Sequence, residues 1–207
     1  MFISFEGTEG VGKTTLIRKI YDYLIAKDKD VVLTREPGGT PLAENIRHML
    51  LATDSSESMA HDTELLLIYA ARAQHIQHVI LPALNENKIV LSDRFTDASY
   101  AYQCSGRGLS KDKLQTLNET FVHTMPDITF WLDAPISLGM QRARERGELD
   151  RFEQEKIVFF ERVYSGYADL LQLYPARIKR LDATQEPDQV FEQAKFFIDQ
   201  HLAKSSF

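Results

Sequence analysis

The feature that most constrains the fold is a glycine-rich stretch near the N-terminus. Residues 7–14 read GTEGVGKT and fit the pattern G-x-x-x-x-G-K-[ST] of a phosphate-binding loop. Residues 2–5, FISF, are apolar and rich in strand formers, and apolar residues recur at helical spacing over 16–25. A strand, a glycine-rich turn and a helix, in that order, are the context that the pattern requires. The sequence therefore predicts an anion site at the N-terminus of a helix.

The residue types in this loop indicate how it would hold a nucleotide. Its glycines let the backbone bend tightly and turn several amide groups toward one anion. We expect Lys13 to reach the β- and γ-phosphates and the Thr14 hydroxyl to bind Mg²⁺. The predicted ATP-binding residues are Gly7, Thr8, Glu9, Gly10, Val11, Gly12, Lys13 and Thr14. An incidental turn before a helix is the alternative, and the flanking elements disfavour it.

Length and composition narrow the class of protein. A chain of 207 residues suits one domain, residues 1–207, with at most a short inserted lid. The net charge of −6 argues against a general nucleic-acid binder. No apolar run approaches the roughly 20 residues of a membrane span, and the N-terminus lacks the basic region of a signal peptide. The single cysteine rules out an intrachain disulfide, and together these features predict a cytoplasmic protein without a membrane partner.

Strands and helices are predicted to alternate along the chain. Apolar runs predict strands at residues 2–5, 31–34, 89–94, 127–133 and 177–181. Helices are predicted after the loop, at 41–50, about 62–85, 97–104, 111–122, from 135, about 152–173 and 190–202. This alternation predicts an α/β fold of the three-layer P-loop type, with a five-stranded parallel sheet and helices on both faces. Because ligands bind at the carboxyl ends of such strands, the residues that follow them should converge on one cleft.

The arginines around this cleft outnumber what one triphosphate requires. Asp93 follows a buried strand, as a Walker-B-like carboxylate does, and with the loop it predicts Mg-ATP. Guanidinium groups suit bidentate phosphate contacts, so a second phosphate-bearing substrate would explain the others. These residues are Arg35, Arg47, Arg72 and Arg94. As alternatives, Arg72 could be a surface residue and Asp93 could cap the next turn.

A second group of arginines lies in a short glycine-containing connection at 142–151. Arg142, Arg144, Arg146 and Arg151 fit a lid, over about 142–152, that brings positive charge to a transferring phosphoryl group and excludes water. A solvated helix end is the alternative for Arg144 and Arg146. His75 and His78 could form a metal pair, but no further Cys or His lies near them in the sequence, which disfavours it.

Five blocks of the sequence together resemble bacterial thymidylate kinase. They are EGTEGVGKTT at 6–15, TREPGGT at 34–40, YAAR at 69–72, DRF at 93–95 and RERGELDR at 144–151. The resemblance runs from about Ile3 to Thr184. It implies a Mg²⁺-dependent enzyme that transfers the γ-phosphoryl group of ATP to dTMP, giving dTDP for dTTP synthesis. It also implies a homodimer.

The resemblance assigns roles to single residues. Glu9 matches a carboxylate that holds the 3′-hydroxyl of dTMP, and Arg72 matches an arginine that hydrogen-bonds thymine. Arg35, Arg47 and Arg94 resemble the clamp on the monophosphate. The pocket around base and sugar would be closed by Ser99, Tyr102 and Gln103.

One position of the loop suggests where the catalytic arginine lies. Gly10 stands where one subgroup of the family has an arginine, so the lid should supply it here. Arg146 is the first candidate, with Arg144 and Arg151 behind it. In family members the bond corresponding to Glu36-Pro37 is cis.

The sequence departs from the family pattern beside the base-reading arginine. Many members have a Phe that stacks on thymine four residues before it, whereas this chain has Ile68 there and Tyr69 next to it. Either Tyr69 stacks on the base or Ile68 forms a weaker apolar floor.

Three other functions are compatible with a phosphate-binding loop. Another nucleoside monophosphate kinase would keep the loop and the lid and change the base pocket, but residues 34–40 and Glu9 count against it. A regulatory GTPase should carry N-K-x-D, yet Asn87-Lys88 is followed by Ile-Val. A mechanical ATPase would want Glu after Asp93, where this chain has Arg94.

Overall fold

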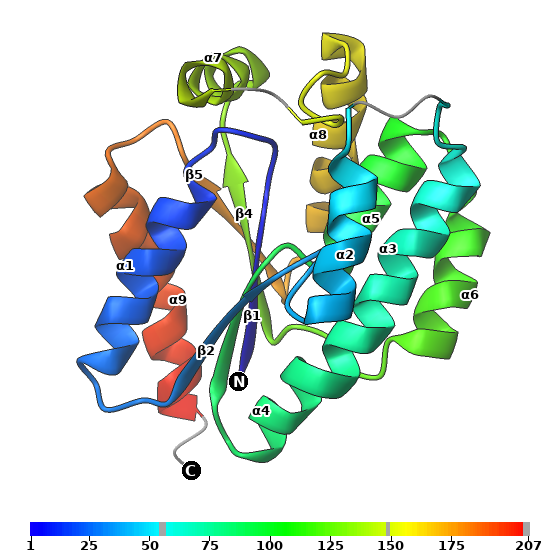
Figure 1. The fold of residues 1–207 in the computed structure, drawn as a ribbon. Coiled ribbons are helices and arrows are strands. Elements are labelled where there is room, and N and C mark those ends of the chain that lie inside the picture. Colours follow the sequence, from blue (N-terminus) through cyan, green and yellow to red (C-terminus); the bar gives the residue numbers. More distant parts are fainter. Residues whose placement is uncertain (54–56, 148–149, 205–207) are drawn as a thin grey trace.

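The apolar runs of the sequence form the strands of one sheet, all of them parallel (Figure 1). The structure is a computed structural model that describes residues 1–53, 57–147 and 150–204. Its strands are β1 (Phe2–Glu6), β2 (Val31–Arg35), β3 (Ile89–Asp93), β4 (Ile128–Asp133) and β5 (Ile178–Asp182). They are ordered β2-β3-β1-β4-β5, so the strand that leads into the glycine-rich loop is central. The predicted five-stranded parallel α/β fold is confirmed.

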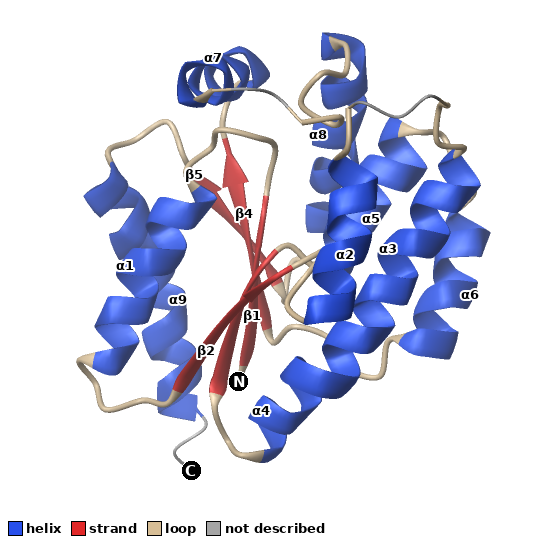
Figure 2. Cartoon of the chain, in the orientation of Figure 1, coloured by secondary structure: helices blue, strands red, loops and turns tan. Residues whose placement is uncertain are grey.

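Helices cover both faces of the sheet (Figure 2). On one face, α1 (Lys13–Ile25) and α9 (Pro187–Lys204) pack over Ile3 and Phe5 of β1, in a core that also contains Ile20. Alternate residues of β1 point to the opposite face, as the two-residue period of a strand requires. The elements on that side are α2 (Pro41–Leu51), α3 (His61–His75), η1 (Ile76–Ile80), α4 (Leu81–Asn85), α5 (Thr96–Ser99), η2 (Tyr100–Gly106), α6 (Lys111–Phe121) and α8 (Ile157–Leu173).

The helix predicted over 62–85 is not uniformly α-helical. It consists of α3, a π-helical segment η1 and the short α4, which has Pro82 in its first turn. Proline lacks a backbone N–H, so the i→i−4 pattern cannot run through it unchanged. The helix predicted at 97–104 likewise continues as the π-helical η2 to Gly106.

The segment around the predicted lid also differs from expectation. Helix α7 (Ile136–Arg146) extends further than predicted, so Arg144 lies on a helix and not on a connection. The predicted start of the next helix at 152 is wrong, because α8 begins at Ile157. In between, the Asp150 carboxylate accepts the backbone N–H groups of Phe152 and Glu153, both at 2.9 Å, which forms a separate turn. Among the described residues, no helix is long and apolar enough to cross a membrane.

Candidate active site

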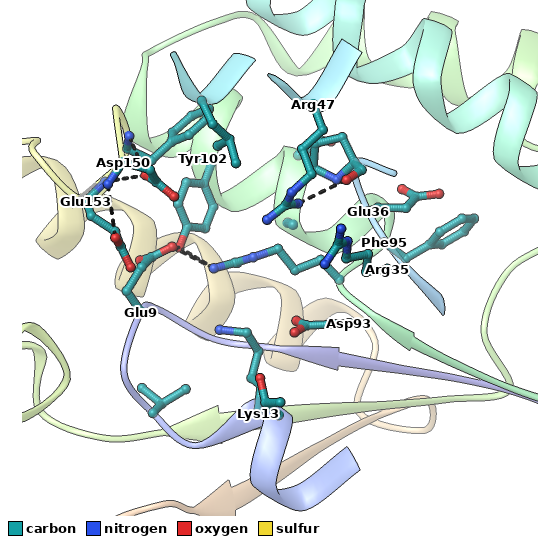
Figure 3. A pocket seen from close by; sticks show the side chains of 18 of the residues that line it. Glu9, Lys13, Arg35, Glu36, Arg47, Asp93, Phe95, Tyr102, Asp150 and Glu153 are labelled. Atoms are coloured by element: carbon teal, nitrogen blue, oxygen red, sulfur yellow. Dashed lines mark hydrogen bonds and ion pairs between the residues drawn. The ribbon is translucent and has the colours of Figure 1, made fainter. Parts of the chain in front are cut away.

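A cavity of about 630 Å³ opens at the carboxyl ends of the central strands (Figure 3). The glycine-rich loop forms its floor, and α2, α3 and η2 contribute the opposite wall. Its lining residues are 9–15, Arg35, Glu36, Pro37, Arg47, Leu51, Ile68, Arg72, 93–95, Ala98, Ser99, Tyr102, Gln103, Arg142, Asp150, Phe152 and Glu153. The residues that follow β1, β2 and β3 therefore meet at one site. Gly7 and Thr8 shape the loop beneath the cavity and are outside its lining.

The glycines of the loop adopt conformations that other residues rarely take. Gly10 and Gly12 have φ values of 69° and 93°. A Cβ atom on Gly10 would lie 2.0 Å from the carbonyl oxygen of Gly139 in α7. An arginine at position 10 therefore does not fit this arrangement, in which the loop lies directly against α7.

Lys13 begins α1 and lies within the loop. Its Nζ donates to the carbonyl oxygens of Thr8 at 2.8 Å and Gly7 at 3.3 Å. Burial, reinforced by the charge of Arg94, lowers the pKa of Lys13 to about 8. Figure 3 shows the side chains of Lys13 and Asp93 directed toward the same part of the cavity. The charged form of Lys13 is therefore destabilised in the empty loop, and a bound anion would stabilise it.

Asp93 ends β3 with one carboxylate oxygen unused. Its Oδ1 is buried and has no hydrogen-bond partner within the described part of the chain. Thr14, in the first turn of α1, lines the same cavity. A hydroxyl and a carboxylate oxygen are hard ligands of the kind that Mg²⁺ prefers.

Arg94 holds Glu9 at the edge of the loop. Its Nη2 donates to Glu9 Oε1 at 2.7 Å, and its Nη1 donates to the carbonyl oxygen of Gly7 at 3.0 Å. The Tyr102 hydroxyl donates to the same carboxylate at 2.8 Å. Arg94 has a φ of 71°, an uncommon conformation for a non-glycine residue and one that often marks functional sites.

Two further guanidinium groups face the cavity from the opposite side. Arg35 forms an ion pair with Glu44 at 2.9 Å, and Arg47 Nη1 donates to the carbonyl oxygen of Pro37 at 3.0 Å. Burial, together with the nearby charge of Arg35, lowers the pKa of Arg47. The Glu36-Pro37 bond beside them is cis. The two guanidinium groups form a positively charged wall. A bound phosphate dianion would offset the repulsion between their charges.

Arg72 is buried, so the surface alternative for this residue is wrong. Its Nε donates to Glu36 at 2.7 Å, and its Nη2 donates to the carbonyl oxygen of Phe95 at 3.2 Å and to Ser99 Oγ at 3.0 Å. Its Nη1 is buried without a hydrogen-bond partner among the described residues. Arg72, which lines the cavity, therefore keeps Nη1 available to donate a hydrogen bond to a ligand.

Ile68 and Tyr69 lie on different sides of Arg72. Ile68 lines the cavity, whereas Tyr69 is outside its lining. The Tyr69 ring lies 4.6 Å from the Arg72 guanidinium carbon, and its hydroxyl donates to Asn118 at 2.7 Å. Tyr69 thus supports Arg72 from behind. His75 is buried between Thr34 and Glu36, at 2.6 and 2.9 Å, while His78 is exposed, so these two histidines do not form a metal pair.

The arginines of the predicted lid are in three different situations. Arg151 turns away from the loop: its Nε donates to the carbonyl oxygen of Leu50 at 2.7 Å, and its Nη2 lies 2.8 Å from Glu64. Arg144 is exposed on α7, outside the cavity lining. The side chain of Arg146 lies outside the described part of the structure.

Several lining residues were not predicted from the sequence. Glu36 and Asp150 lie inside the blocks quoted above, so their motifs could have suggested them. Phe152 and Glu153 were assigned to a helix and carried no local signal. Arg142 was predicted only as part of the lid, yet it lines the cavity.

The comparisons with known proteins agree with this geometry. The family model for thymidylate kinase matches residues 5–194. The thymidylate kinase of Acinetobacter baumannii (strain AYE) is 76% identical over 194 residues, covering 94% of this chain and 98% of that protein. That of Psychrobacter sp. (strain PRwf-1) is 48% identical over 205 residues, covering 97% and 98%. The crystal structure of thymidylate kinase from Ehrlichia chaffeensis matches with a TM-score of 0.77 and 32% identity, covering 96% of this chain and 98% of that one. The chain therefore belongs to the thymidylate kinase family.

Proposed function

We propose that the chain transfers the γ-phosphoryl group of ATP to dTMP, giving dTDP. The observation that carries the proposal is one cavity that joins a phosphate-binding loop to the buried, unused donor of Arg72. Such a cavity offers sites for two ligands, one at each end. Phosphoryl transfer requires that the γ-phosphate of ATP and the phosphate of dTMP meet between these two ends.

ATP binds at the loop end. The loop amides and Lys13 hold the β- and γ-phosphates, and the approach of these anions keeps Lys13 protonated. Thr14 and Asp93 would hold Mg²⁺, largely through water and phosphate oxygens, and the buried Oδ1 of Asp93 fits this role. When bound, the ion neutralises charge on the transferring group.

The monophosphate of dTMP binds to Arg35, Arg47 and Arg94. These guanidinium groups come from three elements around one space, which suits several contacts to a tetrahedral dianion. Glu9 accepts a hydrogen bond from the 3′-hydroxyl of the sugar. Hydrogen bonds from Arg94 and Tyr102 fix the position of its carboxylate for this contact.

Thymine binds at the far end, against Arg72. The unused Nη1 of Arg72 donates to a carbonyl oxygen of the base, and Ile68 forms an apolar floor. Ser99 and Gln103 complete this end. Tyr69 contributes through Arg72, which it supports by a cation–π contact, and does not stack on the base.

The lid completes the site during transfer. Arg146 supplies positive charge to the transferring phosphoryl group. Arg144, on the same helix, is the second candidate for this role. Arg151 would have to leave Glu64 in order to reach the loop. Exclusion of water by the lid favours transfer to dTMP over hydrolysis of ATP.

The enzyme is a cytoplasmic homodimer in this proposal. Three exposed apolar side chains on the neighbouring helices α2 and α3, Leu42, Met49 and Leu66, are 53%, 52% and 59% exposed. Burial of this surface against a second copy would stabilise the dimer. Sedimentation of the wild type beside Leu66→Glu tests it: a monomer in both cases would contradict the dimer.

The function is tested by the release of ADP from Mg-ATP with dTMP, dUMP, dGMP, AMP, UMP and CMP as acceptors and water as the blank. We expect turnover mainly with dTMP. Turnover mainly with another monophosphate would keep the kinase and overturn the base pocket. Release of ADP regardless of the acceptor would contradict the transfer reaction.

A further inference from the structure

A charged network lies buried behind the base end of the cavity, and the carboxylate at its centre has no role in the function proposed above. Its centre is Glu64, in the first turn of α3, whose side chain is fully buried. Glu64 accepts hydrogen bonds from Gln103 Nε2 at 2.9 Å and from the Nε and Nη2 of Arg107, both at 3.2 Å. Arg151 Nη2 lies 2.8 Å from its second oxygen. Burial alone would raise the pKa of Glu64, but the hydrogen bond from Gln103 and the Arg107 guanidinium lower it, so the carboxylate is ionised.

The ionised carboxylate determines how the Gln103 amide is oriented. A carboxylate only accepts hydrogen bonds, so the amide nitrogen must face Glu64. The amide oxygen is then the atom that Gln103, a lining residue, has available for the cavity. The neighbouring Arg72 presents a donor, its unused Nη1. The base end thus offers one donor and one acceptor, each fixed by a buried partner.

This pattern distinguishes between the two kinds of pyrimidine. Thymine and uracil place a carbonyl oxygen at C4 beside an N3–H donor, which matches a donor from Arg72 and an acceptor from Gln103. Cytosine places an amino donor at C4 beside an N3 acceptor, so both contacts would be mismatched. A site with unpaired buried polar groups rejects the wrong ligand strongly.

The same carboxylate anchors the end of the lid segment. Arg151 packs against the Phe152 ring, with its guanidinium carbon 4.5 Å from the ring centroid, and also holds the end of α2 through the carbonyl oxygen of Leu50. Arg107 forms an ion pair with Glu155. The turn that carries Phe152 into the cavity wall is therefore tied to the residue that orients Gln103.

We propose that Glu64 is a positioning residue that sets the preference for thymine over cytosine by holding Gln103 as an acceptor. The inference rests on the proposed function, since it assumes that the base lies against Arg72. Glu64 itself does not contact the substrate.

The test compares the affinities of dTMP and dCMP by calorimetry in the wild type and in Glu64→Gln. A neutral amide at position 64 both donates and accepts, so Gln103 is no longer held in one orientation. In the wild type the dissociation constant of dCMP should exceed that of dTMP, and we expect Glu64→Gln to lower the ratio of the dCMP constant to the dTMP constant by about tenfold or more, which corresponds to the ~1.4 kcal/mol of one hydrogen bond. The affinity for ATP should remain within about twofold. An unchanged ratio of the dCMP to the dTMP dissociation constant in a folded Glu64→Gln enzyme would overturn the inference.

Two further variants separate positioning from general support. Glu155→Gln removes the other anion paired with Arg107 but does not touch Gln103, so it should leave the ratio unchanged. In a Gln103→Ala background, Glu64→Gln should change the ratio no further, because the residue through which it acts is gone. The proposal that Glu64 acts through Gln103 would be contradicted in two cases. One is an equal effect of Glu155→Gln and Glu64→Gln on the ratio, and the other is a double variant in which the effects of Glu64→Gln and Gln103→Ala add.

A second substitution at position 64 tests the inference if the first one prevents folding. If Glu64→Gln is unfolded, Glu64→Asp retains the charge for the arginines while shortening the reach to Gln103, and its ratio should fall in the same direction. An unchanged ratio in that variant would equally reject the inference. A wild type that fails to phosphorylate dTMP would reject the proposed function instead, so the two failures can be told apart.

Discussion

Replacement of Arg72 by lysine separates base recognition from the support of the fold. Among the described residues, Arg72 makes three hydrogen bonds, to Glu36, Phe95 and Ser99, and its Nη1 has no partner. Lysine keeps a positive charge beside Glu36, which avoids the ~3–5 kcal/mol cost of an unpaired buried charge. It cannot reproduce the planar fork of the guanidinium.

The magnitudes follow from the contacts that lysine loses. A hydrogen bond from a charged donor to the base contributes about 1.5–3 kcal/mol, which corresponds to a roughly 10- to 150-fold rise in KM for dTMP. The bonds to the Phe95 carbonyl and to Ser99 contribute about 0.5–1.5 kcal/mol each. Their loss should lower Tm by roughly 2–12 °C in a domain of this size. KM for ATP should not change, because the loop is untouched.

The assay is steady-state kinetics with each substrate varied in turn, together with thermal unfolding. Tyr69→Phe is the matched control: it removes the hydrogen bond to Asn118 behind Arg72 but keeps the ring against the guanidinium and leaves Nη1 in place, so it should lower Tm with a much smaller effect on KM for dTMP. A KM for dTMP within about twofold of the wild type in Arg72→Lys, or a parallel rise in KM for ATP, would refute the assignment of Nη1 to the base.

Three other predictions concern the loop and the lid. Arg146→Ala should lower kcat by roughly 10²-fold or more with little change in KM for dTMP, and an effect confined to KM would show that it only binds substrate. Gly10→Ala should weaken ATP binding at least tenfold and lower Tm more than Gly12→Ala, because its Cβ would lie 2.0 Å from the Gly139 oxygen whereas a Cβ at position 12 has nothing within 4 Å; equal effects of the two in thermal unfolding would contradict the clash. Lys13 has a pKa lowered to about 8 in the free enzyme, so it loses its charge as pH rises through that value, and kcat/KM for ATP should fall above about pH 8 with the loss of one proton. A profile that stays flat to pH 10 would show that the charge of Lys13 is not required.

The features that the sequence predicted well are local ones. The loop over residues 7–14 needs only its own glycines and the flanking elements, and the structure has β1 and α1 on either side of it. The helix predicted at 41–50 likewise begins at Pro41, where the preceding Thr40 side chain accepts the Ala43 N–H at 3.1 Å. The apolar strand residues predicted the parallel sheet, since strands buried on both faces are apolar throughout.

The features that the sequence could not predict depend on residues far apart in the chain. Arg72 was open to a surface interpretation because its partner Glu36 lies 36 positions away. The choice between Ile68 and Tyr69 depends on how α3 is rotated against the cavity, which its packing on α2 and α6 determines. The start of α8 was wrong because a turn held by Asp150 competes with the helix.

The sequence by itself thus determined the chemistry of the molecule: a phosphate loop, a carboxylate after a strand, a set of arginines, and a family in which these act on ATP and dTMP. Only the tertiary structure decided which arginine does what. Within the described part of the chain, Arg72 is buried with its Nη1 unpaired, Arg151 forms an ion pair with Glu64, and Arg94 donates to the carboxylate of Glu9. The physical reason is that a guanidinium group has five donors and a long, flexible stem, so its role depends on which acceptors the fold brings within reach. Those acceptors lie on other strands and helices, and no local pattern in the sequence specifies them.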